Sequence, residues 1–550
     1  MRSLDFYDRG PDRPWANPQL VTAAIVGHTT ETAARIWVRV WKPASYCLLV
    51  SDQPIPRDGK PQIVAAGNGS SKAVLQTSAG PAALPGTIYK ADLTFLTDLT
   101  AVFDVNSLQA GTDYYYAVFA NEAQPNAWEL PPDEALRKFR TRESNPDRVT
   151  FGLYSCHMPY TGSGNVANTH MWESFVRELE DYAANFVIGG GDQVYTDGNS
   201  RVSIWRWLKK VKADMPKDDA QCLAIMRSWY RDIYRGYWGI PQVRRLFERF
   251  PNYMIWDDHE IKDGWGSYTK KELANELDSV FEWENSKANL RLAYLMFEAA
   301  RLTYIEYEHS HNPATPDGVF DYSFDWGRFP FFVLDMRGQR DFNRKTKDKI
   351  LGAAQMERFT AWLASAAVQS APVLFIVSPV PVVHVANFIV NHLDIPFLGL
   401  ADDFRDEWEH DSNWDERNQI LDATFDLSES AGKPIVFLSG DVHVAAAFKL
   451  FRKTRPAARV YQLTSSGITY AAAPPGLKFA VRENGELGDS KARLKGNPTA
   501  FRLLHRVLSQ NNYGIVEADC TGASPAIQWH IYGNTGQADE VMRLKALSLE

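Results

Sequence analysis

Four separate apolar runs in this 550-residue chain each end in residues that can bind a metal ion or carry a proton. They occupy residues 149–157, 185–192, 253–260 and 434–443. Each apolar part has the length of a buried β-strand. The carboxyl ends of parallel strands meet at one edge of an α/β sheet, where such proteins place their chemistry. The pattern therefore predicts an α/β fold with one functional site built from several strand ends.

The second run leads into residues 191–197, GDQVYTD. Asp192 and Tyr195 are three residues apart, so one turn can direct both side chains at a single cation. Carboxylate and phenolate oxygens suit a hard, iron-like metal better than a soft one. A turn with a capping Asp192 and a packed Tyr195 would also explain this segment, so the other strand ends must decide between the two interpretations.

The other three runs supply ligands of similar kinds. They end in the sequences SCH (155–157), WDDHE (256–260) and SGDVH (439–443). One such ending is often only a turn, because Asp and Ser favour turns, but four in one chain indicate ligands that converge. A reduced Cys156 would be a good iron ligand, since the metal lowers the pKa of its thiol. The alternative is a buried, apolar cysteine.

In this order, the motifs resemble those of the calcineurin-like metallophosphoesterases. The forms here, together with LDMR at 334–337, resemble the alkaline phosphatase D (PhoD-like) family from about residue 150 to 470. The resemblance implies an α/β fold in which an N-terminal β-sandwich precedes a two-sheet αββα metallophosphoesterase domain. It also implies hydrolysis of phosphate esters at a centre that contains iron, expected to be ferric, and a divalent companion, expected to be calcium.

The resemblance also assigns a role to each candidate residue. Metal ligands are expected at Cys156, Asp192, Tyr195, Asp258, Asp441 and His443. In this set Cys156, Tyr195 and Asp441 join Asp192 at the iron, Asp192 bridges to the second metal, Asp258 binds the second metal, and His443 binds either metal or orients the phosphate. Catalytic roles are expected for His259, which would contact phosphate and protonate the leaving group, and for Arg337, which would clamp phosphate oxygens.

Further ligands or proton donors are possible at His157, Asp263 and Asp335. His157 and Asp263 stand where related proteins often carry amide side chains, so both positions bear on the companion metal. For Arg337, a surface salt bridge is the alternative. Because a phosphate ester repels hydroxide, hydrolysis needs cations that neutralise the phosphoryl oxygens and supply a metal-activated hydroxide.

The first part of the chain has a different pattern. Residues 1–19 form an N-terminal extension, and residues 20–143 alternate apolar and polar side chains between frequent turns. This is typical of an antiparallel β-sandwich of the immunoglobulin or fibronectin type. The catalytic domain is expected over residues 148–550. Within it, residues 203–249 and 271–309 show helical spacing, and residues 402–415 are expected to form a solvated surface loop.

Composition narrows the class of protein further. A net charge of −8 gives no strongly basic surface for nucleic acid. Residues 371–390 are apolar but contain three prolines, which favours a buried strand at 372–377 and a loop over a membrane span.

Four widely spaced cysteines suit a reducing compartment. No signal peptide begins the sequence as given, so we expect a cytoplasmic protein, or an exported one from which a leader has been removed.

The sequence leaves other functions open. The main alternative to a phosphatase or phosphodiesterase is a catalytically silent module that binds a phosphate-containing polymer or lipid in the same cleft. A carbohydrate-binding sandwich would instead place the function in residues 20–143. The substrate and the oligomeric state do not follow from the sequence, because leaving-group contacts lie on variable loops.

Overall fold

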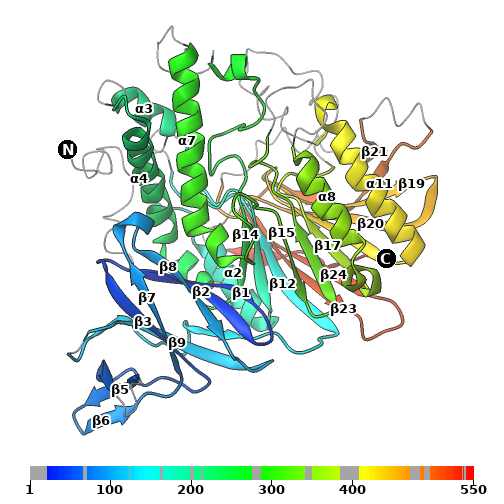
Figure 1. The fold of residues 1–550 in the computed structure, drawn as a ribbon. Helices are drawn as coiled ribbons and strands as arrows, with labels where there is room; N and C mark the ends of the chain where they lie inside the picture. The colour runs from blue at the N-terminus through cyan, green and yellow to red at the C-terminus, as the bar shows by residue number, and fades with distance from the viewer. Residues whose placement is uncertain are drawn as a thin grey trace.

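A computed structural model describes residues 22–549 apart from 66–70, 123, 162–164, 198–202, 212–214, 275–285, 341–349, 384–407, 471–482, 489–495, 536 and 538–539. The described chain has a mixed α/β fold with several sheets (Figure 1), which confirms the α/β part of the expected fold class. Two large sheets form its centre.

The first large sheet has the strand order β14-β13-β12-β23-β24-β25, and β26 also pairs with β24. Its strands are β12 (Arg148–Tyr154), β13 (Phe186–Gly190), β14 (Asn252–Ile255), β23 (Asn512–Asp519), β24 (Ala526–Asn534), β25 (Val541–Arg543) and β26 (Leu547–Leu549). Strands β12, β13 and β14 run parallel to one another. Their carboxyl ends therefore lie at one edge of the sheet.

The second large sheet has the order β15-β16-β17-β18-β20-β19-β22-β21. Its strands are β15 (Tyr322–Trp326), β16 (Phe329–Val333), β17 (Leu374–Val377), β18 (Pro434–Ser439), β19 (Ala445–Arg452), β20 (Arg455–Ser465), β21 (Asn484–Glu486) and β22 (Ala500–Leu508). Strands β16, β17, β18 and β20 are parallel. β17 confirms the buried strand expected at 372–377, and residues 384–390 of the loop after it lie outside the described residues.

An aromatic core lies between the two large sheets. The ring of Phe151 on β12 packs edge-on against Phe331 and Phe375 of the other sheet, with centroids 5.3 and 5.2 Å away. The outer face of the first sheet is covered by α2 (His170–Asp181), and Gly152 of β12 leaves room there for Phe175. On the outer face of the second sheet lie α8 (Gly352–Leu363), α9 (Ala366–Ser370) and α11 (Trp414–Ala431) (Figure 1).

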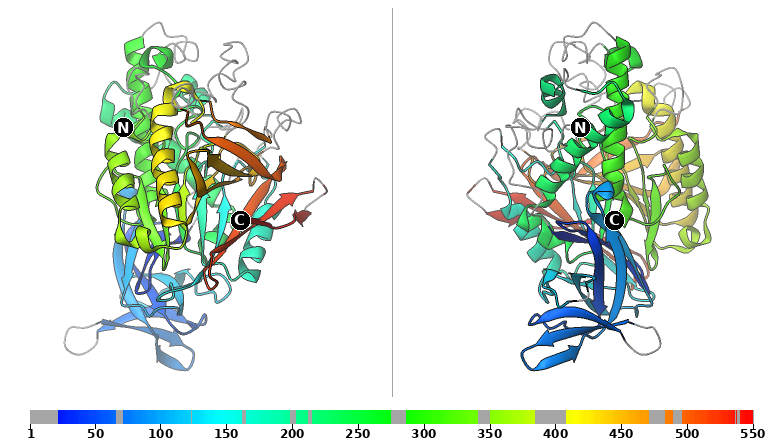
Figure 2. Two further views of the ribbon diagram at one scale, coloured as in Figure 1. Left: turned by 90° about the vertical axis from the view of Figure 1, so that its right-hand side faces the viewer. Right: turned by 60° about the vertical axis from the view of Figure 1, so that its left-hand side comes forward.

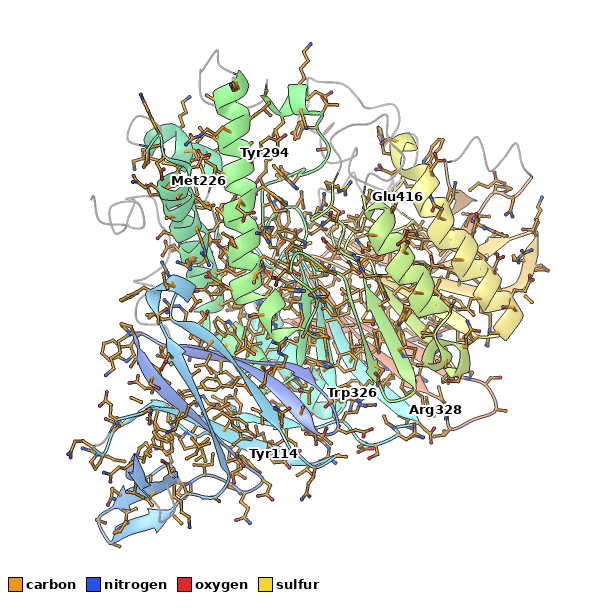
Figure 3. All side chains as sticks on the ribbon, viewed as in Figure 1. Tyr114, Met226, Tyr294, Trp326, Arg328 and Glu416 are labelled. Carbon is orange, nitrogen blue, oxygen red and sulfur yellow. The ribbon has the colours of Figure 1, made fainter. Side chains whose placement is uncertain are left out.

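The N-terminal strands form three smaller sheets, which lie at the end of the molecule away from α3 (Ile204–Val211) and the top of α7 (Ser286–Tyr307), as labelled in Figure 1 and seen from two further sides in Figure 2. The first contains β1 (Ala23–Thr29), β2 (Ala33–Arg39) and β8 (Thr100–Asn106). The second contains β3 (Ala44–Ser51), β7 (Thr87–Leu93), β9 (Asp113–Ala120), β10 (Trp128–Leu130) and β11 (Lys138–Arg140). The third contains β4 (Lys60–Ala65), β5 (Ser71–Thr77) and β6 (Gly80–Ala83). The first two share a core that includes Tyr114, labelled in Figure 3.

Four further helices pack into the same apolar core as strands β12, β13 and β14. They are α3 (Ile204–Val211), α4 (Asp219–Trp238), α5 (Pro241–Phe247) and α7 (Ser286–Tyr307). They confirm the helical spacing seen over 203–249 and the later part of 271–309. The described residues also include short 3-10 helices, η3 (Phe95–Thr97), η5 (His309–His311) and η6 (Asp411–Asn413). No helix of the described residues is long and apolar enough to cross a membrane.

The expected surface loop at 402–415 requires a correction. Residues 402–407 lie outside the described part, but Trp408 and Glu409 are fully buried. The indole of Trp408 donates to Ser378 Oγ at 3.1 Å, and Glu409 pairs with Arg417 of α11 at 3.0 Å. The acidic composition predicted a solvent-exposed loop, but the buried ion pair between Glu409 and Arg417 holds this part of the segment in the core.

Candidate metal centre

The four strand endings selected from the sequence meet at one edge of the two large sheets. Strands β12, β13 and β14 bring Cys156, Asp192 and the pair Asp257–Asp258 from the first sheet, and β18 brings the segment after Ser439 from the second. The two sheets approach closely here. A Cβ on Gly440 would lie 2.4 Å from Ser155 Oγ and 2.7 Å from Gly190 O, so only glycine fits at the junction.

Backbone geometry also marks this edge. Cys156, Asp192, Asp441 and His443 have positive φ angles of 55°, 57°, 66° and 53°. Residues with a side chain rarely adopt this left-handed conformation, and where they do they gather at functional sites. Here the left-handed turns carry the candidate ligands.

A first cluster forms around Asp192 Oδ2. Cys156 Sγ lies 3.3 Å from this oxygen, and the Tyr195 hydroxyl donates to it at 3.0 Å. The same hydroxyl lies 3.3 Å from His443 Nε2. The ligand atoms of Cys156, Asp192 and His443 all lie within 4.8 Å of one another. Four of the predicted ligands therefore converge, and the cluster includes the His443 ring rather than the Asp441 carboxylate.

Two further clusters adjoin the first. One joins Asp192, Asp258 and His259, and the other joins Asp257, Asp258 and Asp441. Asp192 belongs to two clusters and Asp258 to two, which is the arrangement expected of carboxylates that bridge neighbouring cations. Asp257 was missing from the sequence prediction, although it directly precedes Asp258. The family pattern names one acidic residue before the His, and this chain offers two.

The centre has a buried floor and a more open rim. Cys156, Asp192 and Tyr195 are at most 1% exposed, whereas His259 and His443 are partly exposed. The two histidines are therefore the members of the centre nearest to solvent among these five residues.

The electrostatics of the floor favour cations. Burial raises the pKa of the Cys156 thiol, and the carboxylates of Asp192 and Asp441 raise it further. Burial, followed by Asp192 and Cys156, raises the pKa of Tyr195. Asp192 Oδ1 is buried and has no hydrogen-bond partner among the described residues. A thiol, a phenol and an incompletely satisfied carboxylate are a donor set that suits ferric iron, which would favour their charged forms. The residues present therefore fit a metal centre.

His259 is held by a residue that the sequence prediction missed. Its Nδ1 lies 2.8 Å from Asp197 Oδ1. Although burial lowers the pKa of His259, the carboxylates of Asp258, Asp192 and Asp197 raise it well above its usual value. Asp197 lies two residues after Tyr195 in the same acidic turn. This position in the motif could have identified it as a site residue from the sequence. The contact with Asp197 fixes the orientation of the imidazole.

Four other predicted residues lie outside the three clusters. The ring of His157 is buried, with Nδ1 2.9 Å from Thr469 Oγ1, and it packs against Trp172; burial lowers its pKa to about 3. Asp335 accepts hydrogen bonds from the Trp256 indole and from the backbone of Arg337 and Gly338. Each of these two side chains serves packing or a turn in this structure.

The remaining two are Arg337 and Asp263. The Arg337 guanidinium is 1% exposed; it pairs with Asp257, lies 3.7 Å from Asp258 Oδ1 and donates to Trp265 O at 2.9 Å. It is therefore turned toward Asp257 and Asp258 in this structure, and its role as a phosphate clamp stays a prediction. Asp263 is exposed, and its backbone N–H bonds to Asp197.

Comparison with known proteins gives a consistent result. A solved structure described as the structure of PhoD superposes with a TM-score of 0.56 and 15% identity, covering 96% of this chain and 92% of that one. The uncharacterized protein YGR266W of Saccharomyces cerevisiae is 22% identical over 336 residues, which are 50% of this chain and 47% of the yeast protein. The chain thus spans about half the length of this curated relative. The model of the PhoD-like phosphatase family matches residues 151–513, well over half of the chain, and the protein therefore belongs to the PhoD-like phosphatases.

Proposed function

We propose that this protein is a metal-dependent phosphomonoesterase or phosphodiesterase. In this proposal residues 20–143 form a β-sandwich and residues 148–550 form the αββα catalytic domain. The observation that carries it is the set of three ligand clusters that share Asp192 and Asp258 at the meeting edge of two sheets. A binding module would not need a sulfur, a phenol and several carboxylates around the same point.

Cys156, Asp192, Tyr195 and His443 would hold iron, and Asp257, Asp258 and Asp441 would hold the divalent companion, with Asp192 between them. Sulfur, phenolate and imidazole suit iron, whereas a site made only of carboxylates suits calcium. Bound in this way, the cations would neutralise phosphoryl oxygens and supply a nucleophile from water at neutral pH.

The chain's own residues complete the reaction. His259 lies at the open rim, and its Nδ1 is occupied by Asp197, so the proton on its other nitrogen can pass to the oxygen of the leaving group. Arg337 sits behind Asp257 and Asp258 and keeps these two carboxylates charged and oriented. Tyr470 stacks on His443, with ring centroids 3.6 Å apart, which fixes the direction of that ligand.

The test is turnover of nitrophenyl phosphate and bis-nitrophenyl phosphate by the purified protein, with elemental analysis of the same sample. We expect hydrolysis that a chelator abolishes and that added iron and calcium restore. Binding of phosphate without turnover, in protein that contains its metals, would favour the catalytically silent module instead.

A further inference from the structure

Glu260 lies directly after the ligand pair Asp257–Asp258 and His259, yet its carboxylate belongs to none of the three ligand clusters. The side chain is fully buried. Its position in the motif suggests a role at the centre. Its contacts indicate that this role differs from metal binding, which is proposed for Asp257 and Asp258.

The two oxygens of Glu260 connect two separate turns. Oε1 accepts hydrogen bonds from the backbone N–H groups of Gln193 and Val194, the latter at 3.4 Å. Oε2 accepts from Asp192 N at 3.2 Å and from Asp257 N at 2.8 Å. The first three amides belong to the turn after β13, and the fourth belongs to the turn after β14. One oxygen atom thus joins the two turns.

Each hydrogen bond to Glu260 among the described residues comes from a backbone N–H, so both carboxyl oxygens act as acceptors for the ligand turns. These amides need such an acceptor, because buried N–H groups are almost always paired. Asp192 also has the left-handed φ of 57°, so its turn depends on tertiary contacts to keep its shape. Glu260 provides these contacts from inside the protein.

We infer that Glu260 is a positioning residue that sets the spacing between the Asp192–Tyr195 turn and the Asp257–Asp258 turn, and so determines how tightly the centre holds its metals. The inference rests on the proposed function for the identity of the ligands. Altering a residue that hydrogen-bonds to a metal ligand, without binding the metal itself, typically changes metal affinity by about 10–100-fold. The expected effect is therefore measurable.

Glu308 offers a matched control. It is also fully buried, and its Oε1 accepts from the Tyr234 hydroxyl at 2.7 Å. Among the described residues it bonds to no amide of either ligand turn. Burial raises the pKa of Glu308, as it raises that of Glu260, so Glu308→Gln alters a comparable buried carboxyl group without removing an acceptor from either ligand turn. Glu260→Gln makes the same chemical change at a carboxylate that joins the turns.

The experiment is a chelator titration of the purified holoprotein, with bound iron and calcium counted by elemental analysis and the fold monitored by thermal unfolding. Glu260→Gln should release metal at about 10–100-fold lower chelator concentration than wild type, because its NH₂ group cannot accept from an amide and the hydrogen bonds of one of the two carboxyl oxygens are therefore lost. Glu260→Asp is one methylene shorter and should also weaken retention. Glu308→Gln should behave like wild type.

Three results would overturn the inference. Wild-type metal retention in folded Glu260→Gln is the first, and an equal loss in Glu308→Gln is the second. Unfolding of both Glu260 variants is the third, because the residue would then support the core in general. A wild type that binds metal but hydrolyses no phosphate ester would contradict the proposed function, while the chelator titration would still decide the role of Glu260.

Discussion

The left-handed backbone of Cys156, Asp192, Asp441 and His443 is the clearest residue-scale sign of function. Each such conformation costs about 1–3 kcal/mol and persists only where surrounding contacts hold it. Those contacts are visible at Cys156, whose sulfur lies 3.0 Å from Ser466 Oγ, and at His443, whose backbone N–H donates to the same hydroxyl at 2.9 Å. The protein therefore gives up some stability to hold these four residues at the adjoining ligand clusters.

Tyr195 tests the identity of the metal. A phenolate bound to ferric iron absorbs visible light, so we expect a coloured protein whose absorption band weakens and shifts in Tyr195→Phe. The control is Tyr470→Phe, since Tyr470 contacts His443 through its ring and should leave the band in place. A colourless protein that contains only zinc would contradict the assignment of iron.

His259 tests the proton donor. General acid catalysis is typically worth about 10²–10⁴-fold, and a nitrophenolate leaving group hardly needs it. We expect His259→Ala to keep its metals and to lose far more activity on an alkyl phosphate than on nitrophenyl phosphate. Asp197→Asn should show a weaker form of the same bias, because it loosens the imidazole. Equal losses on both substrates, or loss of metal, would make His259 a ligand or a structural residue.

At the scale of elements, α4 and α7 connect the N-terminal sheets to the ligand turns. Tyr230 and Tyr237 of α4 donate to Ile261 O at 2.6 Å and to Tyr195 O at 3.3 Å. Between these two tyrosines, Arg235 of α4 pairs with Asp98 of the β7–β8 connection at 2.6 Å. Asp98 also pairs with Arg39 of β2 at 3.4 Å and accepts from the hydroxyl of Tyr307 of α7. Hydrogen bonds and ion pairs of these helices thus link the N-terminal sheets to the ligand turns.

Asp98 tests this connection. Although burial raises its pKa, Arg235 and Arg39 hold the pKa of Asp98 below its usual value. Its contribution to stability is therefore present above about pH 4, the unfolded pKa, and is lost as the pH falls through the lower folded pKa. Removing one partner of a buried pair costs about 3–5 kcal/mol. Asp98→Asn should lower the free energy of unfolding by that amount at pH 7, measured by denaturant titration.

The matched control is Asp104→Asn. Asp104 pairs with Arg35 at 3.0 Å, but its side chain is 67% exposed, and exposed pairs contribute about 0–1 kcal/mol. Equal destabilisation by the two variants would mean that the buried network has no special role in joining the sheets to the helices.

At the scale of the whole molecule, the N-terminal sheets share a core with the catalytic part. Ala23, Ile25 and Trp37 belong to the same apolar cluster as the strands of the first large sheet. Trp37 packs on Trp238 and Tyr307, with centroids 5.9 and 5.5 Å away, and its indole donates to Glu306 O at 2.7 Å. A shared core of this kind argues against an independent carbohydrate-binding module.

Calorimetry tests the shared core. Because the two parts bury the same side chains, we expect one cooperative thermal transition for the whole chain, with the calorimetric enthalpy equal to the van't Hoff enthalpy. Two resolved transitions, one of them sized for about 120 residues, would show that the N-terminal sheets unfold separately.

The sequence predicted the strand endings well, because an apolar run followed by Asp, Cys or His is a local pattern. It predicted the α/β class and the family for the same reason. It did not predict Asp257 as a candidate ligand beside Asp258, and it did not predict which residues Arg337 and His157 contact. These contacts depend on which neighbouring element each side chain packs against. Glu409 shows the same limit, since its buried partner Arg417 belongs to a different element. Tertiary contacts decided each of these positions.

The most direct test of a shared metal centre is the metal content and turnover of Asp192→Asn beside wild type. Asp192 belongs to two of the three clusters, so losing its charge removes a ligand from both cations at once. We predict a folded protein with reduced metal content and turnover lowered by at least about 10²-fold, the effect of losing several kcal/mol of transition-state stabilisation. Near-normal turnover with wild-type metal content in Asp192→Asn would contradict the account.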